Sequence, residues 1–194
     1  LTILEKELDG SFLKEALSKL GIEMKNTSSD GTKGEYYPNP ELGEGTIKIY
    51  GDEGQSFLHE ITHHFDSILI EGTPFASVTE GDKRWSGSFD KLFEKINKTE
   101  SAATWRNDAS PARAKYLTSR EEVFARVLDQ YFWTKSPSYR RYLPEPYEMW
   151  MTSSEIESIK PEIESVLREY GIRVTQKSFV QHAVSEVGKH LGPG

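Results

Sequence analysis

Residues 52–71 constrain the fold most, because their polar and apolar side chains separate onto two faces of an α-helix. His59, His63 and Asp66 share one face. The apolar positions recur at helical spacing and form another: Leu58, Ile61, Phe65, Ile68 and Leu69. Asp52 can cap the start of the segment and Gly72 follows its end, which predicts a helix over about residues 52–71.

The sequence HEITH lies inside this helix and matches the H-E-x-x-H pattern of zinc-binding helices. Helical residues four apart project side by side, so His59 and His63 can reach one metal ion together. Glu60 lies next to that face, where it can take a proton from a metal-bound water. The alternative is an ordinary amphipathic helix whose histidines face solvent.

The other two polar residues of this helix allow different interpretations. His64 is rotated about 100° from His63 around the helix, so we predict a surface histidine. Asp66 lies on the side of His63, where it either orients a ligand histidine or remains a solvated aspartate. The chain has no cysteine, so histidines and carboxylates must hold any metal.

A catalytic zinc site needs a third protein ligand. The segment SREEVFAR opens a second amphipathic helix, predicted over about residues 119–133, and supplies Glu121 and Glu122. Glu122 lies at the edge of the apolar stripe, whereas Glu121 turns further toward solvent. The rival role for Glu122 is a capping box with Ser119. His182 and His190 lie in a weakly patterned tail and are poorer candidates.

The remaining pattern predicts an α+β chain that is mostly helical. Strands are expected at residues 35–37 and 46–50, as a small antiparallel element whose second strand is an edge strand just before the histidine helix. Further helices are expected at 1–20, 88–97, 154–170 and 177–191, with a break at Pro161. Residues 25–34, 72–87 and 98–116 are expected to be loops.

Taken together, HEITHHFD and KYLTSREEVFARVLDQYF resemble the lethal-factor-like zincins, a group that includes the anthrax lethal factor catalytic domain and the Pro-Pro endopeptidases. The combination is also similar to metallopeptidase domains of phage and mobile-element polyvalent proteins. The resemblance covers residues 46–135. It implies a zincin-like metallopeptidase domain at residues 1–150, followed by a helical C-terminal extension at 151–194.

The resemblance implies a role for each matching residue. His59, His63 and Glu122 would bind Zn²⁺, and Glu60 would act as general base. Tyr116 would stabilise the oxyanion, although it precedes Glu122 by one residue less than in the lethal-factor pattern. The implied activity is that of a zinc-dependent endopeptidase with an HExxH motif and a glutamate ligand.

The strand before the histidine helix gains a role from the same resemblance. In zincins an edge strand above the cleft pairs with extended substrate. The residues expected to bind substrate in this way are Thr46, Ile47, Lys48, Ile49 and Tyr50. A purely structural strand is equally compatible with the sequence.

Charge and composition limit the partners. The net charge is −7 and no segment is dominated by Lys and Arg, so neither nucleic acid nor an anionic membrane surface is expected as a partner. A protein or peptide substrate and a monomeric state are expected. The chain starts at Leu1 and shows no signal-peptide core or membrane span, which leaves an exported effector and a bacterial cytoplasmic protein both open.

Two other functions are compatible with the sequence. The first is a zinc-stabilised, non-catalytic module that binds a partner within a larger effector or polyvalent protein, although such a module has no need of Glu60. The second is a metal-free helical interaction domain with surface histidines.

Overall fold

The computed structural model describes residues 18–26, 32–42, 44–51, 54–68, 70, 73–78, 86–135, 140 and 150–169. In these ranges the chain is α+β and mostly helical, with three strands followed by six α-helices. No helix in this part of the chain is long and apolar enough to span a membrane. The helix expected at 177–191, and residues 1–17 of the one expected at the N-terminus, lie outside the described residues.

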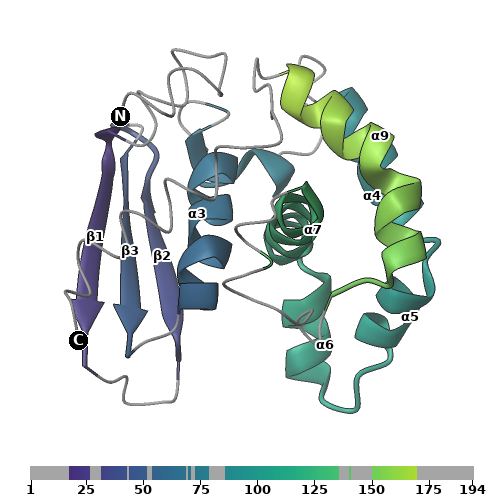
Figure 1. Cartoon of the computed structure of the whole chain (residues 1–194), viewed down its shortest axis with the longest axis horizontal. Helices are drawn as coiled ribbons and strands as arrows, with labels where there is room; N and C mark the ends of the chain where they lie inside the picture. The colour runs from purple at the N-terminus through teal and green to yellow at the C-terminus, as the bar shows by residue number, and fades with distance from the viewer. Residues whose placement is uncertain are drawn as a thin grey trace.

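The strands form one mixed sheet in the order β1-β3-β2 (Figure 1). Their bounds are Leu20–Lys25 for β1, Gly34–Asn39 for β2 and Glu44–Tyr50 for β3. β2 and β3 are an antiparallel pair with Tyr37 opposite Thr46, whereas β1 runs parallel to β3 with Ile22 opposite Ile47. Alternation along β3 buries Ile47 and Ile49 in the core.

β3 is the central strand, so the prediction of an edge strand at residues 46–50 is wrong. Both of its edges are hydrogen-bonded, one to β1 and one to β2. The sequence pattern does not indicate β1, because a helix was expected at residues 1–20. The partner of β1 is also distant in the sequence, so local residues do not reveal the pairing. Pro38 lies in β2 and has no backbone N–H to donate. An edge strand tolerates this, because it needs ladder hydrogen bonds on one side only. β2 is the edge strand nearest α3 (Figure 1).

The two helices predicted to carry the site are confirmed as α3 (Gly54–Ile68) and α7 (Arg120–Lys135). α3 lies between the sheet and α7 (Figure 1). Thr62 of α3 donates a hydrogen bond to the Ala125 carbonyl of α7, over 3.2 Å. Ala125 is fully buried, so its small side chain lets the two helices approach closely. The Leu58 side chain and residue Leu69 lie outside the described part of the chain.

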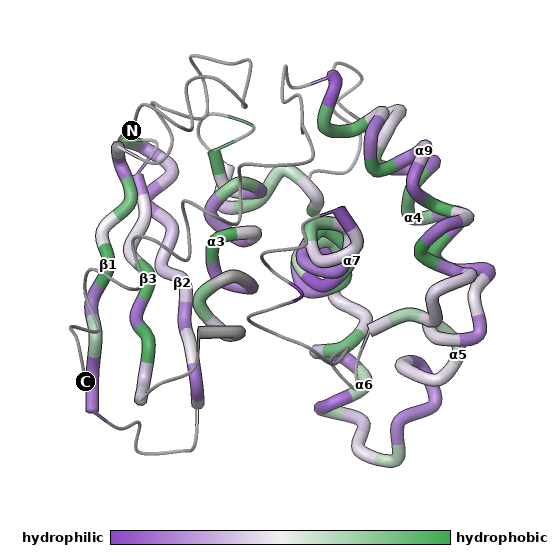
Figure 2. Tube along the Cα trace, viewed as in Figure 1, coloured by the Kyte–Doolittle hydropathy of each residue, from purple (hydrophilic) through white to green (hydrophobic). Residues whose placement is uncertain are grey.

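α4 (Ser86–Ile96) and α9 (Ser153–Glu169) pack against each other on the other side of α7 (Figure 1). Hydrophobic and hydrophilic residues alternate along α9 with helical spacing (Figure 2). The predicted break at Pro161 is wrong, because α9 is continuous through it. Pro161 is exposed, while Ile159 and Ile163 are buried on either side of it and hold the helix in place.

The loop predicted at residues 98–116 is also wrong, since it contains α5 (Glu100–Arg106) and α6 (Pro111–Thr118). The hydroxyl of Thr99 caps α5 by accepting a hydrogen bond from the Ala102 N–H. Ser110 caps α6 in the same way. Both helices bury few side chains and therefore lack apolar periodicity. The capping residues Thr99 and Ser110 are the sequence signal that could have predicted these helices.

Glu155 ties the start of α9 to α5. Its carboxylate accepts hydrogen bonds from the backbone and hydroxyl of Ser101 and from those of Thr152, over 2.5–3.0 Å. Burial would raise the pKa of Glu155, but these hydrogen bonds lower it to about 2. A carboxyl group with a lowered folded-state pKa stabilises the fold above its unfolded pKa of about 4.5, and this contribution is lost as the pH falls toward 2.

We therefore expect Glu155→Gln to lower the free energy of unfolding at pH 7 by about 1 kcal/mol. The difference from the wild type should shrink between pH 4.5 and pH 2, as urea denaturation at a series of pH values would show. Glu157→Gln is the matched control, because the exposed Glu157 side chain pairs only with the nearby Lys160 in the described structure. Equal destabilisation by Glu155→Gln at pH 7 and pH 2 would contradict this account.

Candidate metal centre

α3 presents His59 and His63 on its side facing α7. Their imidazole rings are perpendicular, with centroids 4.9 Å apart. Thr62, on the turn between them, donates hydrogen bonds to the carbonyl of His59 and to that of Ala125. The same threonine therefore fixes the histidine turn and its distance from α7.

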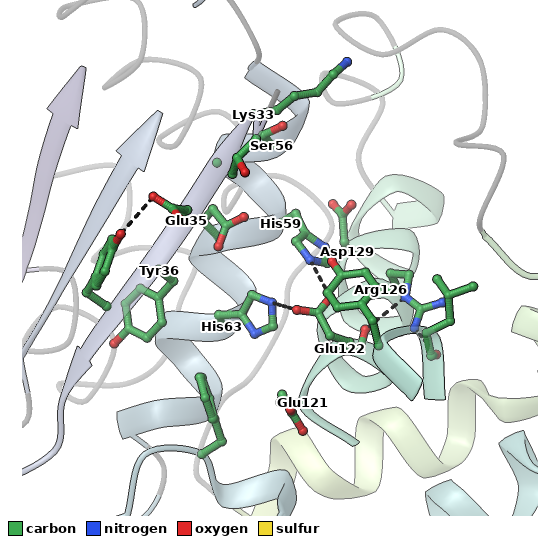
Figure 3. A pocket seen from close by; sticks show the side chains of 17 residues that line it. Lys33, Glu35, Tyr36, Ser56, His59, His63, Glu121, Glu122, Arg126 and Asp129 are labelled. Carbon is green, nitrogen blue, oxygen red and sulfur yellow. Dashed lines mark hydrogen bonds and ion pairs between the residues drawn. The ribbon is translucent and has the colours of Figure 1, made fainter. Parts of the chain in front are cut away.

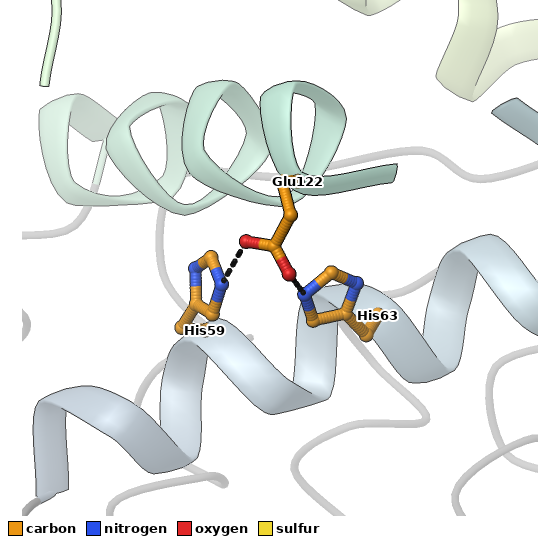
Figure 4. A group of neighbouring side chains, drawn as sticks. All are labelled: His59, His63 and Glu122. Carbon is orange, nitrogen blue, oxygen red and sulfur yellow. Dashed lines mark ion pairs between the residues drawn. The ribbon is translucent and has the colours of Figure 1, made fainter. Parts of the chain in front are cut away.

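Glu122 reaches both histidines from the first turn of α7 (Figure 4). Its Oε2 lies 3.4 Å from Nε2 of His59, and its Oε1 lies 3.3 Å from Nε2 of His63. The carboxylate therefore faces the histidines, and the backbone N–H of Ser119 donates to the Tyr116 carbonyl instead. These contacts favour the ligand role of Glu122 over the capping box.

His59, His63 and Glu122 form a group that could hold a metal ion. Each offers one ligand atom, and the three atoms lie within 4.8 Å of one another. Nδ1 of His63 and Oε2 of Glu122 are buried and have no hydrogen-bond partner among the described residues. Burial alone would raise the pKa of Glu122, but the two imidazoles lower it below its ordinary value. Two imidazoles and an ionised carboxylate are a donor set that suits Zn²⁺.

Glu60 lies beside this group in the same cavity and is 7% exposed. Burial, together with the negative charges of Glu122 and Glu35, raises the pKa of Glu60 to about 7 against the opposing effect of His59. β2 comes very close at Gly34, where an added Cβ would lie 3.0 Å from both Cγ and Oε1 of Glu60. A larger residue at position 34 would therefore crowd the Glu60 side chain.

The side chains of His59, Glu60, His63 and Glu122 line a cavity of about 680 Å³ (Figure 3). Residues 32–37 form one wall, the histidines and Glu60 of α3 the base, and residues of α6 and α7 the opposite wall. Residues 46–50 do not line it, and Ile47 and Ile49 are in the core. Because β1 and β2 pair with both sides of β3, neither edge of β3 is free among the described residues, and the contact of residues 46–50 with substrate stays a prediction.

Tyr116 lies at the end of α6 and lines the wall of the cavity formed by α6 and α7. The residue is 53% exposed. Desolvation of the hydroxyl, followed by the negative charge of Glu122, raises the pKa of Tyr116 above its ordinary value. A tyrosine hydroxyl is protonated at neutral pH even at its ordinary pKa of 10, so Tyr116 can donate a hydrogen bond.

Asp66 is fully buried on α3. Its carboxylate accepts hydrogen bonds from the backbone and hydroxyl of Ser77, over 2.8 and 2.5 Å. Ser77 belongs to the short helix η1 (Ala76–Val78), and its carbonyl accepts from Arg120 of α7. Burial raises the pKa of Asp66 to about 7. Asp66 thus links α3, η1 and α7, and its described hydrogen bonds go to Ser77 rather than to His63.

His64 is fully buried, so the prediction of a surface histidine is wrong. Its Nδ1 lies 2.9 Å from the hydroxyl of Tyr36 in β2, and that hydroxyl is 2.5 Å from Oγ of Ser67. Helical periodicity cannot reveal this burial, because the face that carries His64 is covered by the sheet. Gly34, Tyr36 and Arg126 also line the same cavity, although the sequence patterns did not predict them as site residues.

No protein-family model, curated protein or solved structure matches the chain. A role for the site must therefore come from its own residues.

Proposed function

We propose that the protein is a zinc-dependent endopeptidase that hydrolyses peptide bonds at the His59, His63 and Glu122 group. One observation carries the proposal: Glu122 of α7 contacts both His59 and His63 of α3, although the two helices are distant in the sequence. Glu60 and Tyr116 lie in the same cavity as this group. We further propose, from the motifs alone, that the chain is a lethal-factor-like zincin.

Nε2 of each histidine and a carboxylate oxygen of Glu122 would hold the ion. A bound Zn²⁺ supplies Lewis-acid polarisation of a carbonyl and lowers the pKa of water. Glu60 accepts the proton of the attacking water on its carboxylate and passes it to the leaving amine. The Tyr116 hydroxyl donates a hydrogen bond to the oxygen that becomes negative.

β2 is the strand proposed to bind an extended peptide. Among the described residues it pairs with β3 on one side only, and residues 34–37 of β2 line the cavity. An edge strand can add an extended peptide through backbone hydrogen bonds. Gly34 lies beside Glu60, so a peptide paired with β2 would pass close to the general base.

Cleavage of a mixture of proteome-derived peptides tests the proposal. We expect the zinc-loaded protein to cut within peptides, a chelator to abolish cleavage, and added Zn²⁺ to restore it. The readout is the appearance of new peptide termini by mass spectrometry. If the zinc-loaded protein cut no peptide, it would be a binding module rather than an endopeptidase.

A further inference from the structure

Arg126 lies one turn after Glu122 on α7 and has no role in the mechanism above. It is 4% exposed and lines the cavity beside Glu122 (Figure 3). A buried guanidinium is costly unless its donors are satisfied, so its contacts indicate what it does.

The Arg126 side chain joins three helices. Its Nε donates to the Glu122 carbonyl in α7 over 3.1 Å, and its Nη2 donates to the Leu117 carbonyl in α6. The guanidinium also lies 4.4 Å from the ring centroid of Trp105 in α5. A cation at the C-terminal end of α6 interacts favourably with the carbonyls there.

These contacts converge where α6 meets α7. Ser119 alone separates the two helices, and it adopts an extended conformation with φ −63° and ψ 141°. Rotation about these two angles would swing α6 relative to α7. Tyr116 lies on the last turn of α6 and is 53% exposed, and its hydroxyl donates a hydrogen bond to the Glu122 carboxylate of α7. Leu117, the next residue, is 4% exposed and is held through its carbonyl by Arg126.

We propose that Arg126 is a positioning residue that clamps the last turn of α6 onto α7 and so places the Tyr116 hydroxyl at the cavity wall. The expected effect of Arg126 on kcat rests on the proposed peptidase function, whereas its effect on the position of α6 does not. Lysine keeps the charge but not the planar fork that reaches two carbonyls and stacks on an indole. Arg126→Lys should therefore release α6 without removing the cation.

Two measurements test the clamp. In hydrogen–deuterium exchange of the metal-free protein, Arg126→Lys should speed amide exchange of residues 111–119 by about tenfold or more, while α3 keeps wild-type exchange. In peptide cleavage by the zinc-loaded protein, Arg126→Lys should lower kcat by about tenfold with little change in KM. In a Tyr116→Phe background, the same substitution should have no further effect on kcat.

Arg106→Lys on α5 is the matched control, because Arg106 is exposed and bonds to Asn97. Unchanged exchange of residues 111–119 in Arg126→Lys would overturn the clamp, as would an equal loss of kcat in both backgrounds. If Arg126→Lys fails to fold, Trp105→Leu removes the ring under the guanidinium and must give the same pattern. If the wild type cleaves no peptide, the proposed function is wrong. The exchange measurement on the metal-free protein still tests whether Arg126 holds α6 against α7.

Discussion

Replacing Glu122 by alanine is expected to lower the affinity for Zn²⁺ by at least about 100-fold, since loss of a residue that merely orients a ligand already costs 10–100-fold. The reason is geometric. Glu122 is the only carboxylate in the described group, and its oxygens lie 3.4 Å and 3.3 Å from the ligand nitrogens of His59 and His63. Competition with a zinc-binding indicator would measure the affinity.

Glu121→Ala is the matched control for this experiment. Glu121 precedes Glu122 on α7 and lines the same cavity, but it is not a member of the group that could hold a metal. We expect zinc affinity to be unchanged in this variant. A comparable loss of affinity in both variants would mean that local negative charge, and not the position of Glu122, retains the ion.

Glu60→Gln is expected to lower kcat for peptide cleavage by about 10²–10⁴-fold, the usual contribution of general acid–base catalysis. Glutamine keeps the size of the buried side chain and fits the space beside Gly34, but it cannot accept a proton. Because Glu60 is not a member of the metal-holding group, the variant should bind Zn²⁺ as the wild type does. Steady-state kinetics on a cleaved peptide would give kcat, and the indicator assay would give zinc affinity.

The two readouts distinguish a chemical from a structural effect of this substitution. Loss of both activity and zinc binding would show that Glu60 supports the fold of the site rather than the reaction. A Glu60→Gln protein that cleaves at the wild-type rate would contradict the role of general base.

Local patterns in the sequence were enough to predict the helices that carry the site. The burial of Ile61 and Phe65 from the predicted apolar stripe of α3 and the start of α7 are confirmed. So is the placement of His59 and His63 on one face, because helical spacing alone determines it. The proximity of Glu122 to them was inferred from motifs rather than from spacing, since contact between α3 and α7 is long-range.

The errors arose where distant segments meet. β1 makes β3 a central strand, and nothing within residues 46–50 indicates a second partner. His64 is buried because β2 covers its side of α3, where Tyr36 bonds to it. The role of Arg126 depends on the angle between α6 and α7, and α6 itself was missed because it buries little apolar surface. Strand order, burial by another layer and helix angles are all properties of tertiary packing.

Diffraction from crystals grown with Zn²⁺, recorded on both sides of the zinc absorption edge, would show directly whether His59, His63 and Glu122 hold the ion. We expect one strong anomalous peak about 2.0–2.2 Å from Nε2 of His59, Nε2 of His63 and a carboxylate oxygen of Glu122. A crystal with Zn²⁺ bound elsewhere, and with these three side chains still in contact with one another, would contradict it.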